Sequence, residues 1–171
     1  LDKEGLRSIV ENYDIFYIDL WGVIHNGIKL HDNAIQALEE VAKAKKEYVL
    51  LTNAPRPNKI VSKILEKMGM HKKIREKIYS SGEASLTYLK KNYLNEKFYH
   101  IGPNRDFDLF EELKNNKEKE INKSAYLLCT GLFENQEEDL DYYKELFKDH
   151  INKKMICTNP DLIVDRGNKR E

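Results

Sequence analysis

The feature that most constrains this fold is an alternation of short apolar runs with amphipathic helical stretches. Residues 15–18 and 48–51 are brief runs of aromatic, β-branched and other apolar residues, which is typical of the buried strands of a parallel sheet. Between them, the apolar residues from 34 to 41 follow the i, i+3, i+4, i+7 spacing of a helix face. Strand, helix and strand in this order predict a right-handed crossover and a parallel α/β sheet.

The alternation continues to the carboxyl-terminal part of the chain and restarts once. Residues 78–79 are a further strand candidate, and residues 81–91 open with a capping-box spacing typical of a helix. The later block predicts strands at 98–101, 125–129 and 155–157, helices at 106–113 and 137–150, and a solvated charged loop at 115–123. The chain therefore holds two βα blocks, and a change of domain is expected between residues 80 and 95.

The composition excludes two kinds of partner. The 171 residues contain 29 basic and 29 acidic side chains, so no net field attracts nucleic acid or an anionic membrane. No apolar run approaches the roughly 20 residues of a membrane-spanning helix. Cys129 and Cys157 each lie in an apolar run without metal-ligand spacing. We expect a cytoplasmic protein with reduced thiols, and a disulfide between the two cysteines is the alternative.

An acidic residue ends the first expected strand. Asp19 lies at the carboxyl end of that strand, where open α/β sheets bind their ligands. Gly22 and Gly27 allow the following loop to turn sharply and to direct N–H groups at an anion. The carboxylate is suited to act as a nucleophile, a metal ligand or a general base, and it equally suits a tight turn. The residues alone leave these roles open.

Polar residues also follow the second expected strand. Thr52 and Asn53 come directly after it, so a hydroxyl and an amide reach the same sheet edge as Asp19 if the two strands are neighbours. Arg56 would add positive charge for phosphoryl oxygens. Threonine, asparagine and the nearby prolines also form turns whatever the function, so a simple turn is the alternative.

Three segments in this order resemble the haloacid dehalogenase (HAD) superfamily. They are residues 19–27 (DLWGVIHNG), 51–56 (LTNAPR) and 158–161 (TNPD), and the likeness is to class IIA, a group of sugar-phosphate and nucleotide phosphatases. The first segment is similar to the subgroup with Asp-x-Trp-Gly-Val. The resemblance implies the amino-terminal portion of such an enzyme. Its fold class would be α/β, with an incomplete Rossmann-like HAD core over residues 1–83 and an inserted α/β cap domain over residues 84–171.

The resemblance also implies a chemistry, which is magnesium-dependent hydrolysis of a small phosphorylated substrate. Asp19 matches the family nucleophile, which forms an aspartyl-phosphate and also ligates Mg²⁺. The backbone carbonyl of Trp21 matches a further metal ligand. Thr52 and the adjacent Asn53 match residues that bind the phosphoryl group, and the loop at Gly22 is suited to the same task.

The remaining implied residues belong to the substrate side of the site. Asn159 and Asp161 match a cap segment near the substrate opening. Arg56 is expected to contact the substrate together with them. Small phosphorylated compounds are therefore the expected ligands.

Two departures from the family bear on activity. Trp21 occupies the position where these phosphatases usually carry a second aspartate as general acid and base, and a missing general acid costs about 10²–10⁴ in rate. The later lysine and acidic pair of the family do not occur within the 171 residues. We therefore expect no measurable turnover from the isolated chain.

The alternative to a phosphohydrolase is an inactive truncated or degenerate module that binds a ligand or a complementing polypeptide. In either case the half-core would have an exposed sheet edge. A carboxyl-terminal complementing segment or self-association is expected to cover it.

Overall fold

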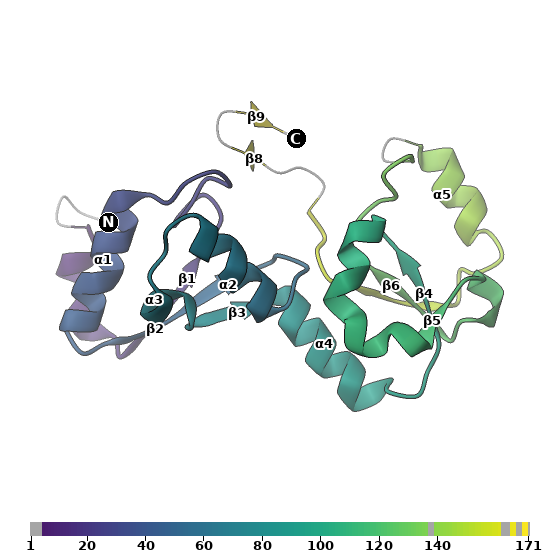
Figure 1. Cartoon of the computed structure of the whole chain (residues 1–171), viewed down its shortest axis with the longest axis horizontal. Helices are drawn as coiled ribbons and strands as arrows, with labels where there is room; N and C mark the ends of the chain where they lie inside the picture. The colour runs from purple at the N-terminus through teal and green to yellow at the C-terminus, as the bar shows by residue number, and fades with distance from the viewer. Residues whose placement is uncertain (1–4, 137–138, 162–164, 167–168, 171) are drawn as a thin grey trace. The chain divides into compact units, whose positions relative to one another are not determined.

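The computed structural model describes residues 5–136, 139–161, 165–166 and 169–170. Contacts divide the chain into two compact units. Unit 1 comprises Leu1–Thr52, Asn58–Ser80 and Asp161–Glu171, and unit 2 comprises Asn53–Pro57 and Ser81–Pro160. Each unit has its own sheet of parallel strands with helices, so the predicted α/β class is confirmed (Figure 1).

The observed division differs in detail from the predicted domains. The middle segment of unit 1 ends at Ser80, before the predicted boundary at residue 83, and unit 1 also includes residues 161–171. The roles of core for residues 1–83 and of cap for residues 84–171 stay predictions.

The sheet of unit 1 has three strands in the order β1 (Ile15–Asp19), β2 (Glu47–Thr52) and β3 (Ile78–Ser80). Both strand pairs are parallel. α1 (Asp32–Lys43) joins β1 to β2, while α2 (Asn58–Lys67) and α3 (Lys72–Arg75) join β2 to β3. Two short 3₁₀ helices, η1 (Gly5–Ser8) and η2 (Val10–Asn12), precede β1.

The helices of unit 1 cover one face of its sheet. Both crossovers step in the same direction across the sheet, so right-handed connections put α1 and α2 on the same side. The buried apolar residues of this layer include Leu38 and Val41 of α1, Val61 and Leu65 of α2, and Tyr48, Leu50 and Ile78 of the sheet. This layer is the apolar core of the unit.

The opposite face of the same sheet is exposed. The pairs Tyr17↔Val49 and Leu51↔Tyr79 place these residues together on that face, because directly paired residues of parallel strands share a face. Tyr17 is 66% and Tyr79 46% exposed. Residues 15–18 do form a strand, but the prediction that this strand is buried is wrong for the described residues. β1 is an edge strand, and its residues alternate between exposed and half-buried.

The sheet of unit 2 has the order β5 (Lys117–Glu118), β4 (Phe98–Ile101), β6 (Tyr126–Cys129) and β7 (Lys154–Cys157), all parallel. α4 (Ser81–Asn92), the 3₁₀ helices η3 (Asn104–Asn116) and η4 (Ile121–Lys123), and α5 (Leu140–Phe147) accompany these strands. The carboxyl-terminal strands β8 (Asp165–Arg166) and β9 (Lys169–Arg170), which belong to unit 1, pair antiparallel.

Three predicted elements of unit 2 differ in the structure. The charged segment predicted as a loop contains β5. A two-residue edge strand requires only backbone pairing, so it can form without apolar side chains. The helix predicted at 106–113 is instead the 3₁₀ helix η3, with non-helical backbone angles at Phe110. The helix predicted at 137–150 is the shorter α5, which begins at Leu140. Asp139 caps this helix, because its side chain accepts a hydrogen bond from the Tyr142 N–H. Residues 137–138 lie outside the described residues.

Across the described residues, none of the helices combines the length and the apolar character that crossing a bilayer requires.

Candidate active site

The three strands of the parallel unit 1 sheet end in polar residues at the same edge of the sheet, where their carboxyl ends lie. Asp19 ends β1 and pairs with Leu51, while Thr52 ends β2 and pairs with Ser80, the last residue of β3. β1 and β2 are therefore neighbours, and this was the condition for placing Asp19 and Thr52 at one edge. Ser80 is a hydroxyl that the sequence reasoning missed as a site candidate. The sequence pattern that could have indicated Ser80 is a third short strand that ends in a polar residue.

The Asp19 carboxylate is exposed, and within the described part of the chain it has no hydrogen bond or ion pair. The Asp19–Leu51 pair lies one residue before Thr52, so strand alternation directs the Asp19 and Thr52 side chains toward opposite faces of the sheet. Thr52 is half-buried. The carboxylate is therefore the more accessible of the two groups and is available to a ligand.

The loop after Asp19 is closed by backbone hydrogen bonds. The Ile24 N–H donates to the Leu20 carbonyl at 2.9 Å, and the Gly22 N–H donates to the His25 carbonyl at 2.7 Å. Gly22 has a φ of 77°, a left-handed conformation that side chains disfavour. The contribution of Gly22 is thus the turn itself, because its N–H is already donated within the loop. The Val23 N–H has no acceptor among the described residues, so it is a hydrogen-bond donor that residue type did not reveal.

His25 stabilises this loop from inside. Its ring is 6% exposed, its Nδ1 accepts a hydrogen bond from the Gly27 N–H at 3.0 Å, and it packs edge-to-face on Trp21 at 5.2 Å between ring centres. Burial, followed by the charge of His31, lowers the pKa of His25, and Asp19 opposes this shift. His25 is therefore a neutral structural residue near pH 7 rather than a proton donor.

The other predicted residues lie elsewhere in the chain. Arg56 belongs to unit 2, where its guanidinium lies 3.7 Å from a carboxylate oxygen of Asp106. Asn53 is exposed, and Asn159 is half-buried, with its carbonyl accepting from the Cys157 thiol at 3.2 Å. Asp161 is exposed and is grouped with unit 1. The structure therefore brings Asp19, Trp21, Gly22 and Thr52 together within one unit, and the roles of Asn53, Arg56, Asn159 and Asp161 stay predictions.

A magnesium ion would find few protein ligands here. In the described ranges, no group of three or more His, Cys, Asp or Glu side chains is placed to hold a metal. The donors at the edge are the free Asp19 carboxylate and the Trp21 carbonyl, both hard oxygen ligands. Mg²⁺ typically keeps several waters and binds through one or two carboxylates together with substrate phosphate, so this donor set fits the ion as part of such a site.

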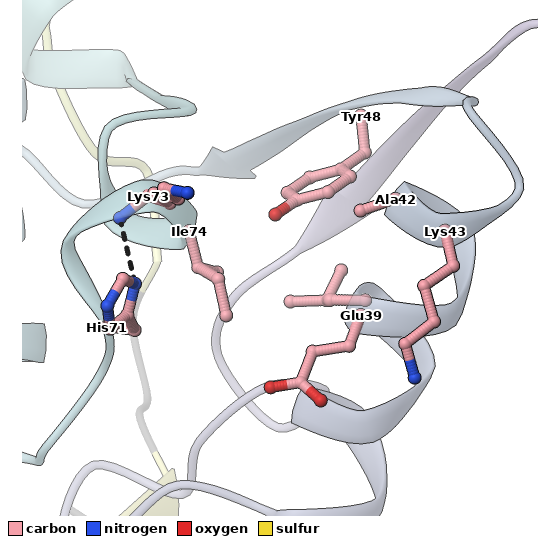
Figure 2. Close-up of a pocket in the computed structure, with 8 residues that line it drawn as sticks. Glu39, Ala42, Lys43, Tyr48, His71, Lys73 and Ile74 are labelled. Atoms are coloured by element: carbon pink, nitrogen blue, oxygen red, sulfur yellow. Dashed lines mark hydrogen bonds between the residues drawn. The ribbon is translucent and has the colours of Figure 1, made fainter.

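A cavity of about 410 Å³ lies at the other end of the unit 1 sheet. Its lining residues come from α1, the start of β2, and the segment around α3 (Figure 2): Leu38, Glu39, Ala42, Lys43, Tyr48, His71, Lys73 and Ile74. Tyr48 lies near the amino-terminal end of β2, whereas Asp19 and Thr52 are at carboxyl ends. This cavity is therefore separate from the candidate active site.

The sequence profile of the haloacid dehalogenase-like hydrolase family matches residues 16–116. That range includes β1 from Phe16 onward, the loop after Asp19 and the segment after β2. Unit 1 has a parallel α/β sheet with an exposed aspartate at the end of its first strand, and the match assigns this arrangement to a class. The chain belongs to the haloacid dehalogenase-like hydrolases.

Solved structures support the same fold. A hydrolase of the haloacid dehalogenase-like family from Brucella suis is 28% identical, with a TM-score of 0.83 over 99% of this chain and 65% of its own. A 4-nitrophenylphosphatase from Thermotoga maritima is 16% identical, with a TM-score of 0.68 over 95% of this chain and 60% of its own. A glycerol phosphate phosphatase from Mycobacterium tuberculosis, solved with magnesium, is 16% identical, with a TM-score of 0.68 over 95% and 49%.

The chain spans less than two thirds of the length of each of these structures. The expected membership of the haloacid dehalogenase superfamily is confirmed, and the partial coverage of these structures fits the expected amino-terminal portion. No curated protein matches the sequence.

Proposed function

We propose that this chain supplies the nucleophile half of a magnesium-dependent phosphohydrolase that acts on small phosphorylated compounds in the cytoplasm. The observation that carries the proposal is the free Asp19 carboxylate, which shares one sheet edge with Thr52 in a chain of the haloacid dehalogenase-like family. Two of the similar structures, from Thermotoga maritima and Mycobacterium tuberculosis, are phosphatases, which points to the same reaction class.

The proposed reaction has two steps. A carboxylate oxygen of Asp19 attacks phosphorus, the ester P–O bond breaks, and the leaving oxygen takes a proton from solvent. Water then attacks the aspartyl-phosphate, which releases inorganic phosphate and restores the carboxylate. Thr52 with Asn53 would hydrogen-bond the transferring phosphoryl oxygens, and the Val23 N–H in the Gly22 turn is available for the same role.

Asp19 and the Trp21 carbonyl would hold Mg²⁺. When bound, the ion would supply charge neutralisation at the phosphoryl oxygens. The chain's own residues would orient the phosphate and provide the nucleophile. Asn159, Asp161 and Arg56 are proposed for the substrate side, where Arg56 would exchange its contact with Asp106 for a substrate anion.

We further propose that additional polypeptide of the same fold covers the exposed face of the unit 1 sheet and the β1 edge. An edge strand with exposed apolar neighbours is a ready pairing surface. The Brucella structure has about a third of its length beyond what this chain matches, and a segment of that size suits this role. Such a segment would carry the later lysine and acidic pair of the family, which do not occur within the 171 residues. A second copy of this chain is the competing occupant of this surface.

The test is hydrolysis of 4-nitrophenyl phosphate with magnesium. The chain would be assayed alone and with the unmatched part of the Brucella hydrolase supplied as a separate polypeptide. We expect no turnover alone and turnover when the two are mixed, with Asp19→Asn reducing the mixed rate by about 10³-fold or more. The alternative, an inactive module, predicts that the two polypeptides associate without turnover.

A covalent readout separates the nucleophile from assembly defects. Acetyl phosphate should transfer its phosphoryl group to Asp19 in the mixed assembly, as a label that hydroxylamine removes. Thr52→Val should weaken labelling while leaving the Asp19 carboxylate in place. Equal labelling of the Asp19→Asn variant would refute the proposed nucleophile.

A further inference from the structure

Two cysteines occupy directly paired positions on neighbouring strands of unit 2. The register of β6 and β7 pairs Cys129 with Cys157, and both are free thiols. Directly paired residues of parallel strands project to the same face, so the two sulfur atoms lie on one side of the sheet. Neighbouring strands are about 4.7–4.9 Å apart, which falls inside the Cα separation of about 4.4–6.8 Å found for disulfides. A bond between them needs no large movement of the backbone.

The two thiols differ in access. Cys157 is exposed on β7, which is one of the two edge strands of its sheet, while Cys129 is partly buried on the inner strand β6. Burial first, and the nearby Cys157 second, raise the pKa of the Cys129 thiol to about 11. Cys157 is therefore the thiol that meets a reagent from solvent, and Cys129 is placed to react second.

We propose that Cys157 and Cys129 form a reversible intramolecular disulfide when the protein meets an oxidised low-molecular-weight thiol. The Cys157 thiolate attacks the small disulfide, forming a mixed disulfide and releasing one small thiolate, which takes up a proton. The Cys129 sulfur then attacks Cys157, loses its proton and displaces the second small thiol. Two protein S–H groups are oxidised to one S–S bond, and the small disulfide is reduced to two thiols.

The exposure of Cys157 favours a bond that is easily reduced. Cys157 is exposed on β7, so a reductant can reach a bond formed there, and exposed disulfides are the labile and regulatory ones. The site therefore acts as a redox-modification site rather than as a structural crosslink. This agrees with the expectation of reduced thiols in a cytoplasmic protein.

Oxidation would change the segment that follows each strand. The Cys157 Sγ donates to the Asn159 carbonyl at 3.2 Å, and the Cys129 Sγ donates to the Gly131 carbonyl at 3.5 Å. A disulfide has no S–H, so both contacts are lost. The Thr158 N–H still holds the Cys129 carbonyl at 2.9 Å, which limits the change to the residues around Asn159 and Gly131.

The experiment is equilibration of the reduced full chain in glutathione buffers of increasing oxidised fraction, followed by acid quench, alkylation and intact mass. We expect a monomer that has lost two hydrogens, with trypsin releasing residues 124–144 joined to residues 155–166. Dithiothreitol should restore the starting mass. In native labelling of the reduced chain, Cys157 should react about tenfold faster than Cys129 or more.

Two matched variants test the order of the steps. Cys129→Ser should accumulate a stable glutathione adduct on Cys157, and Cys157→Ser should resist modification. Far-UV circular dichroism checks that both variants fold. A wild-type chain that stops at the mixed disulfide, or that forms only a dimer linked between molecules, would overturn the proposal.

Discussion

The close contact at Gly82 makes a sharp prediction about the stability of unit 2. Gly82 is buried in the first turn of α4, and its N–H donates to the Ala54 carbonyl at 3.0 Å. A Cβ built there would clash with the Arg56 carbonyl carbon and lie 2.5 Å from the Arg56 nitrogen. Both are backbone atoms, so the segment at residues 53–57 has to move if Gly82 becomes alanine.

The expected loss follows from these contacts. Overpacking costs about 1–3 kcal/mol, and weakening the hydrogen bond to Ala54 adds about 1 kcal/mol. The higher helix propensity of alanine returns about 1 kcal/mol. Gly82→Ala should therefore lower the free energy of unfolding by about 1–3 kcal/mol, which at a denaturant slope of about 2 kcal/mol per molar moves the urea midpoint by about 0.5–1.5 M.

A second glycine provides the matched control. At Gly131 a built Cβ would meet only the Cδ of Pro103 at 3.5 Å, an ordinary van der Waals distance. Gly131→Ala should change the stability by no more than about 0.5 kcal/mol.

Urea unfolding should be followed by far-UV circular dichroism and by amide exchange. The single tryptophan, Trp21, belongs to unit 1 and does not report directly on Gly82. Equal midpoints for the Gly82→Ala and Gly131→Ala chains would refute the close-contact argument.

Three further predictions concern a buried histidine, the exposed sheet face and the missing acid. Burial lowers the pKa of His100 to about 4, against an unfolded value of 6.5; the unfolded chain therefore binds more protons between these values, and stability should fall by up to about 3 kcal/mol as the pH drops from 6.5 to 4. Urea titrations across that range should show a smaller fall for His100→Gln, and an unchanged fall would contradict the assignment. Tyr17→Glu, at a side chain that is 66% exposed, should change the stability of the chain by less than about 0.5 kcal/mol but weaken binding of the complementing polypeptide, measured by calorimetry; undiminished binding would rule out this face. Trp21→Asp should raise the rate of the complemented assembly about 10²–10⁴-fold in the phosphatase assay, with Trp21→Asn as the control that restores no acid, and equal rates for the two variants would count against a missing proton donor.

Local patterns predicted most of the elements because their signals lie within short windows of sequence. The β1, β2, β4, β6 and β7 strands and helix α1 follow from apolar runs and helical spacing, which are visible in the sequence without knowing which elements pack against them. The elements that were missed depend on partners far along the chain. β5 is charged and is a strand only because its backbone pairs with β4, and the kinked 3₁₀ form of η3 has no periodic signature.

The residues of the candidate active site show the same distinction between local sequence patterns and tertiary contacts. The sequence by itself determined that an aspartate ends the first strand, that a glycine turn follows it, and that the motif belongs to the haloacid dehalogenase-like family, because residue type and spacing carry that information. Only the tertiary structure decided that β1 and β2 are neighbours and that Ser80 joins Thr52 at the edge. It also decided that the Gly22 N–H is already donated to His25, that Arg56 faces Asp106, and that Cys129 lies beside Cys157. Each of these depends on strand register or chain folding, which brings together residues that no local window of sequence contains.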